Sequence, residues 1–117
     1  MAYVDGFLLP VPKKNLATYR KMAKFGARLW KKHGALQFRE CVADDLHAPF
    51  SLSFPKLVKL KPGETIFFSY IVFKSRAHRN RVNKAVMNDP AMQKMPPTMP
   101  FDVKRMAYGG FRVLVES

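Results

Sequence analysis

The strand-like segments of this sequence are apolar at consecutive positions, and this feature constrains the fold more than any other. The runs are Phe7 to Leu9, Ile66 to Phe68 continued by Tyr70 to Phe73, and Phe111 continued by Val113 to Val115. Successive side chains of a strand point to opposite faces of its sheet, so these strands are apolar on both faces. An antiparallel sheet with one face in water would alternate apolar and polar residues. We therefore expect both faces of the sheet to be covered.

Proline, glycine and capping residues divide the chain into an order of β-α-β-β-α-β. We expect strands over residues 3–11, 35–43, 65–73 and 104–115, and helices over residues 13–33 and 76–87. Pro12 opens the first helix and Gly34 stops it, because proline is tolerated in a first turn and glycine at a C-terminal cap. Ser75 is the predicted N-cap of the second helix.

Two further segments predict local features. The connection over residues 44–64 is long for a link between strands, and we expect a small extra strand over residues 56–60. Gly109-Gly110 in the last strand predicts a bulge or a point of close approach.

The element order predicts a fold. Residues 1–117 are expected to form one α+β domain, a ferredoxin-like antiparallel sheet with two helices on one face. Two helices cover only one face of such a sheet. We therefore expect a second copy of the chain to cover the other face, sheet against sheet, which makes a homodimer of the dimeric α+β barrel type. A functional site is then expected in the space between the two sheets.

The chain is strongly basic, with a formal net charge of +13 and no acidic residue between Asp5 and Glu40. The first helix concentrates this charge at five positions, namely Lys21, Lys24, Arg28, Lys31 and Lys32. Such a field attracts polyanions, nucleic acid among them. The alternative is a solvated helix face, and the aromatic residues that base stacking requires fall on the apolar stripe instead.

Cysteine usage and hydropathy indicate the compartment. The single cysteine, Cys41, cannot form an internal disulfide, which suits a reducing environment. No apolar run reaches the roughly 20 residues that span a bilayer, and the first residues lack a basic region. We expect a cytoplasmic protein that does not bind membranes.

Polar residues on apolar strand faces are the candidates for chemistry. Asp5 and Ser69 each interrupt such a face on strands that are neighbours in this fold, so they are expected to converge. A buried carboxylate without a full set of partners has a raised pKa and is suited to act as a general base. The alternative for Asp5 is a bond to the backbone or to a lysine. Glu40 shares a face with Phe38 and Val42.

The remaining candidates are less clustered. Arg105 and Tyr108 complete the catalytic candidates, with Asp5, Glu40 and Ser69. Asp44, Asp45 and His78 are candidates for ligand binding, although adjacent aspartates after a strand are also typical of turns.

The sequence shows no motif for a metal or a nucleotide. The histidines have no metal-ligand spacing, and no phosphate-binding glycine loop is present, so we expect no metal site and no cofactor. Methionines 92, 95 and 99, which lie among prolines, suit either an adaptable lid or gap-filling in the core.

Several blocks of sequence resemble one bacterial family. They include Tyr3 to Phe7, Lys61 to Thr65, Ser75 to Arg79, and Pro100 to Asp102 with Gly109 to Phe111. Together they resemble the YbaA-like proteins, catalogued as domain of unknown function 1428, over nearly the whole chain. The resemblance implies a dimeric α+β barrel and supplies no catalytic residues. Val42 and Val103 depart from the family pattern, which tends to have tryptophan and glycine there.

Three classes of function remain open at the level of sequence. The first is binding of a small molecule in the barrel cavity, with or without catalysis. The second is binding of a polyanion such as RNA through the first helix. The third is a structural or protein-interaction dimer without a pocket.

Overall fold

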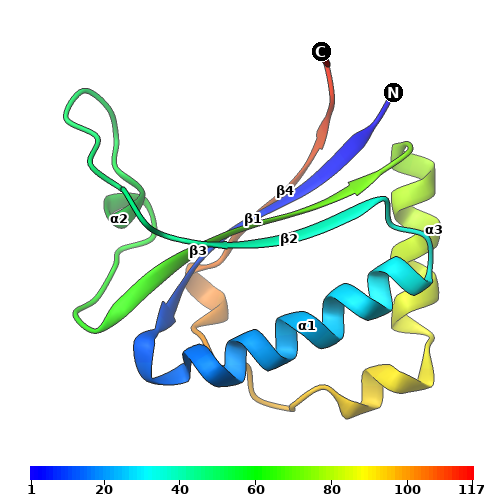
Figure 1. Cartoon of the computed structure of the whole chain (residues 1–117), viewed down its shortest axis with the longest axis horizontal. Coiled ribbons are helices and arrows are strands. Elements are labelled where there is room, and N and C mark those ends of the chain that lie inside the picture. The colour runs from blue at the N-terminus through cyan, green and yellow to red at the C-terminus, as the bar shows by residue number, and fades with distance from the viewer.

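The computed structural model describes residues 1–117 and contains one four-stranded antiparallel sheet of order β2-β3-β1-β4 (Figure 1). Its strands are β1 (Tyr3–Pro12), β2 (Gln37–Val42), β3 (Glu64–Phe73) and β4 (Ala107–Arg112). Its α-helices are α1 (Leu16–Lys32), α2 (Phe54–Leu57) and α3 (Arg76–Met87). Short 3-10 helices are η1 (Lys13–Asn15), η2 (Pro90–Lys94) and η3 (Val103–Arg105). The order of strands and main helices confirms the ferredoxin-like prediction.

Two predicted helix ends, the cap of α3 and the stop of α1, are confirmed, whereas Pro12 ends β1 and α1 begins only at Leu16, after η1. The Ser75 hydroxyl accepts a hydrogen bond from the backbone N–H of His78 at 3.1 Å and so caps α3. Gly34 follows α1 with a φ of 112°, a left-handed conformation that favours glycine. These boundaries follow from local chemistry, which is why the sequence identifies them.

The small strand expected over residues 56–60 is wrong, because this segment begins as the helix α2. Ser53 caps it by accepting a hydrogen bond from the N–H of Lys56 at 3.4 Å, and Pro55 lies in its first turn. A cap and a proline in that position favour a helical turn over an extended strand.

The last strand is shorter than expected, since the 3-10 helix η3 occupies its predicted start. The glycine pair forms no bulge, because Gly109 and Gly110 pair in register with Gly6 and Asp5. The predicted close approach is present. A Cβ atom at Gly110 would lie 2.8 Å from a ring carbon of Tyr3, so only glycine fits.

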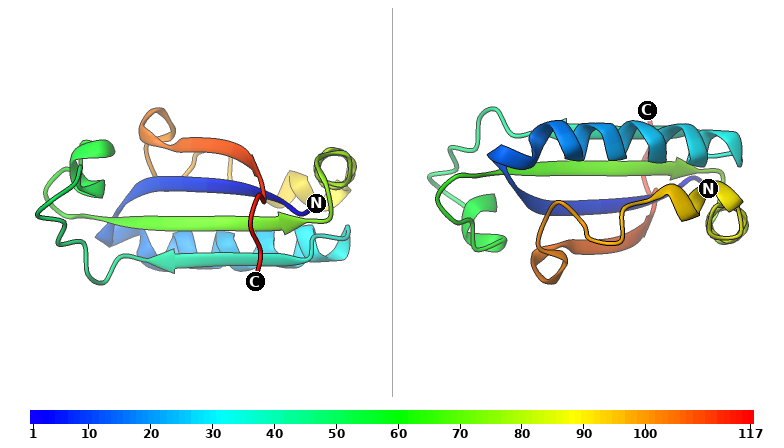
Figure 2. Two further views of the ribbon diagram at one scale, coloured as in Figure 1. Left: turned by 90° about the horizontal axis from the view of Figure 1, so that it is seen from above. Right: turned by 90° about the horizontal axis from the view of Figure 1, so that it is seen from below.

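The two main helices cover the sheet unequally (Figure 2). α1 lies along the β2–β3 half, whereas α3 crosses α1 steeply near one end of the sheet. The chain between α3 and β4, residues 88–106, passes over the β1–β4 half; we call it the roof segment. Core side chains of α1 and α3, including Leu29, Val82 and Val86, pack against Ile71 and Phe73 of β3. A layer of helices and roof therefore covers one face.

The opposite face of the sheet, which we call the outer face, is apolar and largely open. α2 and its loop cover one end of it, where Val58 packs against Leu8 and Ile66. Farther along, Phe68 is 49% exposed and Phe111 is 63% exposed. The predicted apolar character of both faces is thus present, and a single chain covers only one of them. None of the helices is both long and apolar enough to cross a membrane.

Candidate functional site

A cavity of about 420 Å³ lies between the sheet and its layer of helices and roof; we call it the main cavity. Its floor is the sheet, α1 contributes Tyr19 and Trp30, and α3 contributes Asn83. Every methionine except Met1 lines it, namely Met22, Met87, Met92, Met95, Met99 and Met106. Methionine is unbranched and polarisable, so it adapts to apolar ligands of different shape. The roof methionines thus line a cavity.

The floor of the main cavity carries one row of side chains, with one residue from each strand. Glu40 of β2 pairs with Ser69 of β3, Ser69 with Phe7 of β1, and Phe7 with Tyr108 of β4. Residues in such a row share one face and are spaced by about 4.8 Å per strand. The Phe7 and Tyr108 rings stack with their centroids 4.9 Å apart. A carboxylate and a phenol therefore mark the two ends of an apolar floor.

These residues face the helices and not the outer face. The sequence left open which strand faces would look into the space between two sheets. Asp5, Glu40, Ser69 and Tyr108 all line the main cavity, on the helix side of the sheet. The physical reason is the strand register, which places the odd-numbered positions of β1 and β3 under α1 and the roof.

Glu40 is held by two hydroxyl groups. The Tyr19 hydroxyl donates to Glu40 Oε1 at 2.7 Å, and the Ser69 hydroxyl donates to the same oxygen. Burial raises the pKa of Glu40 above its usual value, and the hydrogen bonds from Ser69 and Tyr19 oppose this only in part. No cation bonds to this carboxylate. Glu40 is therefore a partly buried acid whose hydrogen-bond partners are neutral.

Burial, followed by the negative field of Glu40, raises the pKa of Tyr19. The phenol stays protonated at neutral pH and remains a donor. Tyr19 was not among the candidates from sequence, because it falls on the apolar stripe of α1, where an aromatic residue reads as core. Its ring does pack in the core, against Phe67 with centroids 4.4 Å apart.

Asp5 is ion-paired, unlike Glu40. Arg79 of α3 donates to Asp5 Oδ1 at 3.1 Å and to the Tyr108 hydroxyl at 2.8 Å. Burial raises the pKa of Asp5 although the Arg79 guanidinium opposes the shift. Asp5 and Ser69 do line the same cavity, but each has its own partners. The partner of Asp5 is thus an arginine of α3, and neither the backbone nor a lysine.

Arg79 was also missed from sequence. It lies four residues after the helix cap Ser75, where it reads as a solvated basic residue. Its guanidinium lies over the Tyr3 ring, 5.0 Å from the centroid, and its Nε is buried without a partner. The only sequence signal was an aspartate on an apolar strand, which requires a cation from somewhere in the chain.

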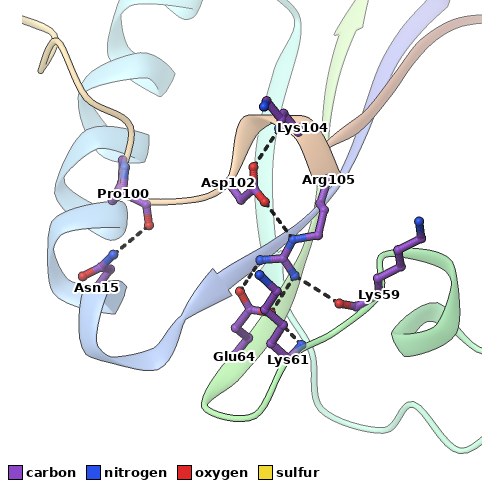
Figure 3. Close-up of polar contacts among 8 residues, drawn as sticks. All are labelled: Asn15, Lys59, Lys61, Glu64, Pro100, Asp102, Lys104 and Arg105. Atoms are coloured by element: carbon purple, nitrogen blue, oxygen red, sulfur yellow. Dashed lines mark hydrogen bonds and ion pairs between the residues drawn. The ribbon is translucent and has the colours of Figure 1, made fainter.

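Arg105 is not among the residues that line the main cavity, and Figure 3 shows the polar contacts that it makes instead. Its guanidinium binds both carboxylate oxygens of Glu64, at 2.7 and 2.6 Å, and its Nε donates to Asp102 at 3.0 Å. The Lys59 carbonyl accepts a further bond at 3.1 Å. All three nitrogens are engaged, so Arg105 ties the end of the roof segment to the start of β3.

The ligand-binding candidates outside the sheet lie apart from the cavity. Asp44 and Asp45 are exposed after β2, and Asp45 accepts a hydrogen bond from the N–H of His47 at 3.2 Å, which is turn chemistry. His78 Nδ1 accepts from the N–H of Lys74 at 2.9 Å, and burial lowers the pKa of this histidine. No group of three or more His, Cys, Asp or Glu side chains comes together in the fold.

A second hollow, of about 490 Å³, lies between α1 and β2; we call it the side groove. It shares Tyr19, Ala23, Phe38 and Glu40 with the main cavity. Its lining also includes Arg20 and Lys24 of α1. Glu40 therefore faces two hollows, one on each side of its strand position.

The five basic residues of α1 that the sequence singled out are all exposed, namely Lys21, Lys24, Arg28, Lys31 and Lys32. Two of them have partners, since Lys31 donates to the Leu36 carbonyl at 2.9 Å and Lys32 pairs with Asp89 at 2.9 Å. The aromatic residues of this helix, Phe25 and Trp30 among them, pack toward the core.

Fold and cavity together define a ferredoxin-like α+β protein with a ligand-sized apolar cavity on the helix side of its sheet. The family model described as "Protein of unknown function (DUF1428)" matches residues 2–103. This chain belongs to that family, as the resemblance in sequence indicated.

Relatives and solved structures agree with this assignment. The chain is 40% identical over 116 residues to "Uncharacterized protein YbaA" of Escherichia coli (strain K12), with 99% of each chain covered. It has the same identity and coverage with the protein of that name from Shigella flexneri. Among solved structures, an uncharacterized NIPSNAP domain protein from Burkholderia xenovorans superposes with a TM-score of 0.60 at 11% identity, covering 95% of this chain and 93% of that one. At such an identity the likeness shows the fold alone.

Proposed function

We propose that this protein binds an apolar small molecule that carries a polar group, and that it does so in the main cavity as a homodimer. The observation that carries the proposal is the row on the cavity floor, where Glu40 and Ser69 lie at one end beside the Phe7 ring and the Tyr108 phenol lies at the other end. Small-molecule sites are commonly apolar hollows of about 300–1,000 Å³ with a few convergent polar groups. A volume of about 420 Å³ falls in that range.

The only tryptophan of the chain gives a direct test. Trp30 lines the main cavity and donates to Asn83 at 3.0 Å, so a ligand that enters should change its fluorescence. We expect the uncharged dye 1-aminoanthracene to quench Trp30 in a saturable titration. Ala23→Phe places a bulky ring of α1 in the main cavity. Because the packed surroundings cannot move to make room for it, the dye should bind at least about tenfold more weakly.

The matched control is Ala17→Phe, at an exposed position of the same helix, which should bind as the wild type does. Circular dichroism establishes that both variants are folded. Equal affinity of Ala23→Phe and the wild type would place the dye elsewhere and remove the proposal. No saturable binding at all would favour the third class, a structural or protein-interaction dimer.

The homodimer is proposed from the outer face. Phe68 and Phe111 lie on it with about half or more of their surface in water, beside Val4 and Tyr70 of the central strands. Contiguous exposed apolar surface of this kind marks an interface in soluble proteins. A second copy is the proposed occupant, because a two-fold interface uses the same surface on both partners and the outer face of each copy can pack against the other.

The second candidate function is binding of a polyanion to the exposed positive charge of α1. Lys21, Lys24 and Arg28 have no acidic partner within the chain. Contacts of this kind reach phosphates only, since no aromatic ring is exposed among them. Retention on heparin that falls steeply with salt would support it, and no retention at low salt would remove it.

A further inference from the structure

We propose that Glu40 is the general base of an enzyme that moves a proton within its ligand, from a carbon next to a carbonyl group to another atom of the same molecule. This inference rests on the proposed function, because it requires a ligand in the main cavity. The substrate class is an uncharged, ring-sized carbonyl compound. Three features of Glu40 carry the inference: its orientation, its free oxygen and its lack of a cation.

The orientation of the carboxylate is fixed on one side. The hydroxyls of Tyr19, from α1, and of Ser69, from β3, both donate to Oε1. These donors are anchored on a helix and a strand, and rigid elements hold a reactive group more tightly than loops do. The side chain is therefore positioned before a ligand arrives.

The other oxygen of Glu40 is free to react. Oε2 accepts no hydrogen bond within the chain. It is not sealed in the core, because Arg79 Nε is the only side-chain polar atom that is buried without a partner. A base must reach the proton that it removes, and Oε2 is the Glu40 oxygen that is free of partners to do so.

The lack of a cation distinguishes Glu40 from the other acids that are held in the fold. Asp5 is paired with Arg79, Glu64 and Asp102 with Arg105, and Asp89 with Lys32. An ion pair lowers the basicity of a carboxylate, whereas an apolar, neutral environment raises it. The direction of the Glu40 pKa shift agrees with this contrast.

Glu40 alone can remove and return the proton that this reaction moves. Oε2 takes the proton from carbon, and the electron pair of the broken C–H bond forms a C=C bond while charge collects on the carbonyl oxygen. The carboxylic acid so formed returns the proton to that oxygen or to a more distant carbon. The product is an isomer of the substrate, and neither an oxidant nor a second reactant is consumed. The carboxylate is restored at the end of each cycle.

The side groove gives the proton a path to solvent. Glu40 lines both hollows, so water can reach it from the α1–β2 side while a ligand occupies the main cavity. A proton held on Glu40 can then exchange with solvent during the cycle. We therefore expect solvent deuterium to appear in the substrate and in the product.

The direct test uses 2-indanone, a rigid bicyclic ketone with acidic hydrogens next to its carbonyl group. In D₂O, the wild-type protein should accelerate deuterium incorporation at those carbons, measured by proton NMR, above an equal concentration of acetate. Glu40→Gln keeps the size of the side chain and removes the base, so it should lose about 100-fold of the rate, a typical contribution of general base catalysis. Glu116→Gln, an exposed residue near the C-terminus, is the matched control and should keep the full rate.

A pH profile separates catalysis from a merely structural role. The probe 5-nitrobenzisoxazole loses its ring C–H proton to a base as its N–O bond opens to a coloured phenolate, so its rate follows the deprotonated carboxylate. The rate should rise with pH through an apparent pKa above the ordinary glutamate value of about 4.3. Ser69→Ala removes a hydrogen bond that lowers this pKa, and should move the profile to higher pH.

The outcomes distinguish this inference from the proposed function. If 2-indanone quenches Trp30 but exchange is no faster than with acetate, or is equal in Glu40→Gln, the base assignment is wrong and cavity binding stands. If neither 2-indanone nor 1-aminoanthracene reaches Trp30, the proposed function and this inference fail together.

Discussion

At the scale of single residues, the two carboxylates of the main cavity, Asp5 and Glu40, should respond oppositely to neutralisation. Glu40 carries its charge among neutral partners, whereas Asp5 carries its charge against Arg79. Removing a charge that has no counter-ion relieves a desolvation cost, and removing one half of a buried ion pair creates such a cost. The same substitution, acid to amide, therefore tests both assignments.

Glu40→Gln should stabilise the protein at neutral pH by on the order of 1 kcal/mol. Because the pKa of Glu40 is raised in the folded state, that state binds the proton more tightly than the unfolded chain does. The stabilisation from this proton is complete below the unfolded pKa of about 4.3 and is lost as pH rises through the folded pKa. The gain in Tm should therefore be present at pH 7, shrink as pH falls through the folded pKa, and be absent below about pH 4. A drop in Tm at pH 7, with Glu116→Gln unchanged, would contradict this account.

Asp5→Asn should destabilise the protein by about 3 kcal/mol, since it leaves the Arg79 guanidinium buried without its counter-ion. Asp5 is 1% exposed, so water cannot replace the lost partner. Urea denaturation measures the change. The double variant Asp5→Asn/Arg79→Met should recover part of the loss, and failure to recover any would mean that the pair is not coupled.

At the scale of elements, the roof segment is held by ion pairs at both of its ends. Near its start, Asp89 accepts from Lys32 at 2.9 Å and contacts His33 at 2.7 Å. Near its other end, Asn15 donates to the Pro100 carbonyl at 3.0 Å, and Arg105 binds Glu64 (Figure 3). The segment itself has little regular structure, so these contacts fix where it lies over the cavity.

Arg105→Met should loosen the roof without unfolding the sheet. Amide hydrogen exchange should become faster in residues 95–106 and remain slow in β1 and β3, because local opening is governed by the contacts of the segment itself. Lys104→Met, at an exposed neighbouring position, should leave exchange unchanged. If amide hydrogen exchange became equally faster throughout the sheet, Arg105 would stabilise the whole fold and not the roof segment in particular.

Low pH should also loosen the roof segment of the wild-type protein. Hydrogen bonds from Arg105 hold the pKa values of Glu64 and Asp102 below their usual range, and bonds to Lys32 do the same for Asp89. Groups with lowered pKa stabilise the fold above their unfolded values of about 4, and this contribution is lost as pH falls through the folded values. We expect roof exchange to accelerate below pH 4 at constant salt, before the sheet opens.

At the scale of the whole molecule, the outer face decides the state of assembly. The wild type should have twice the 13.4 kDa mass of the chain when measured by size-exclusion chromatography with light scattering. Phe111→Lys places a charge on the proposed interface, next to Gly6 and Gly109. It should give a monomer that is less stable or prone to aggregate, because the apolar face is then in water.

The control for assembly is Ala17→Lys, which adds the same charge on α1, on the opposite side of the sheet. It should remain a dimer. A wild-type protein that is monomeric and stable at micromolar concentration would rule out the second copy as the cover of this face.

The sequence by itself determined the elements and their order. Helix caps and apolar runs act over only a few consecutive residues, so they can be recognised in the sequence itself. Examples are the caps Ser75 and Gly34 and the run from Ile66 to Phe68. It also predicted the apolar outer face and placed Glu40 and Ser69 among the candidates. It misread residues 56–60, where a proline and a cap outweighed strand propensity.

Only the tertiary structure decided how those residues combine. Strand register brought Glu40, Ser69, Phe7 and Tyr108 into one row, and packing supplied Tyr19 to Glu40 from α1. Because α3 crosses α1 steeply near one end of the sheet, the roof segment and its methionines cover the β1–β4 half, and the main cavity lies beneath them on the helix side. Each of these contacts joins residues far apart in the chain, and a local pattern does not encode which distant partner a polar group will meet. The sequence therefore predicted several residues of the candidate site, whereas its position in the fold and the partners of each residue followed only from the tertiary structure.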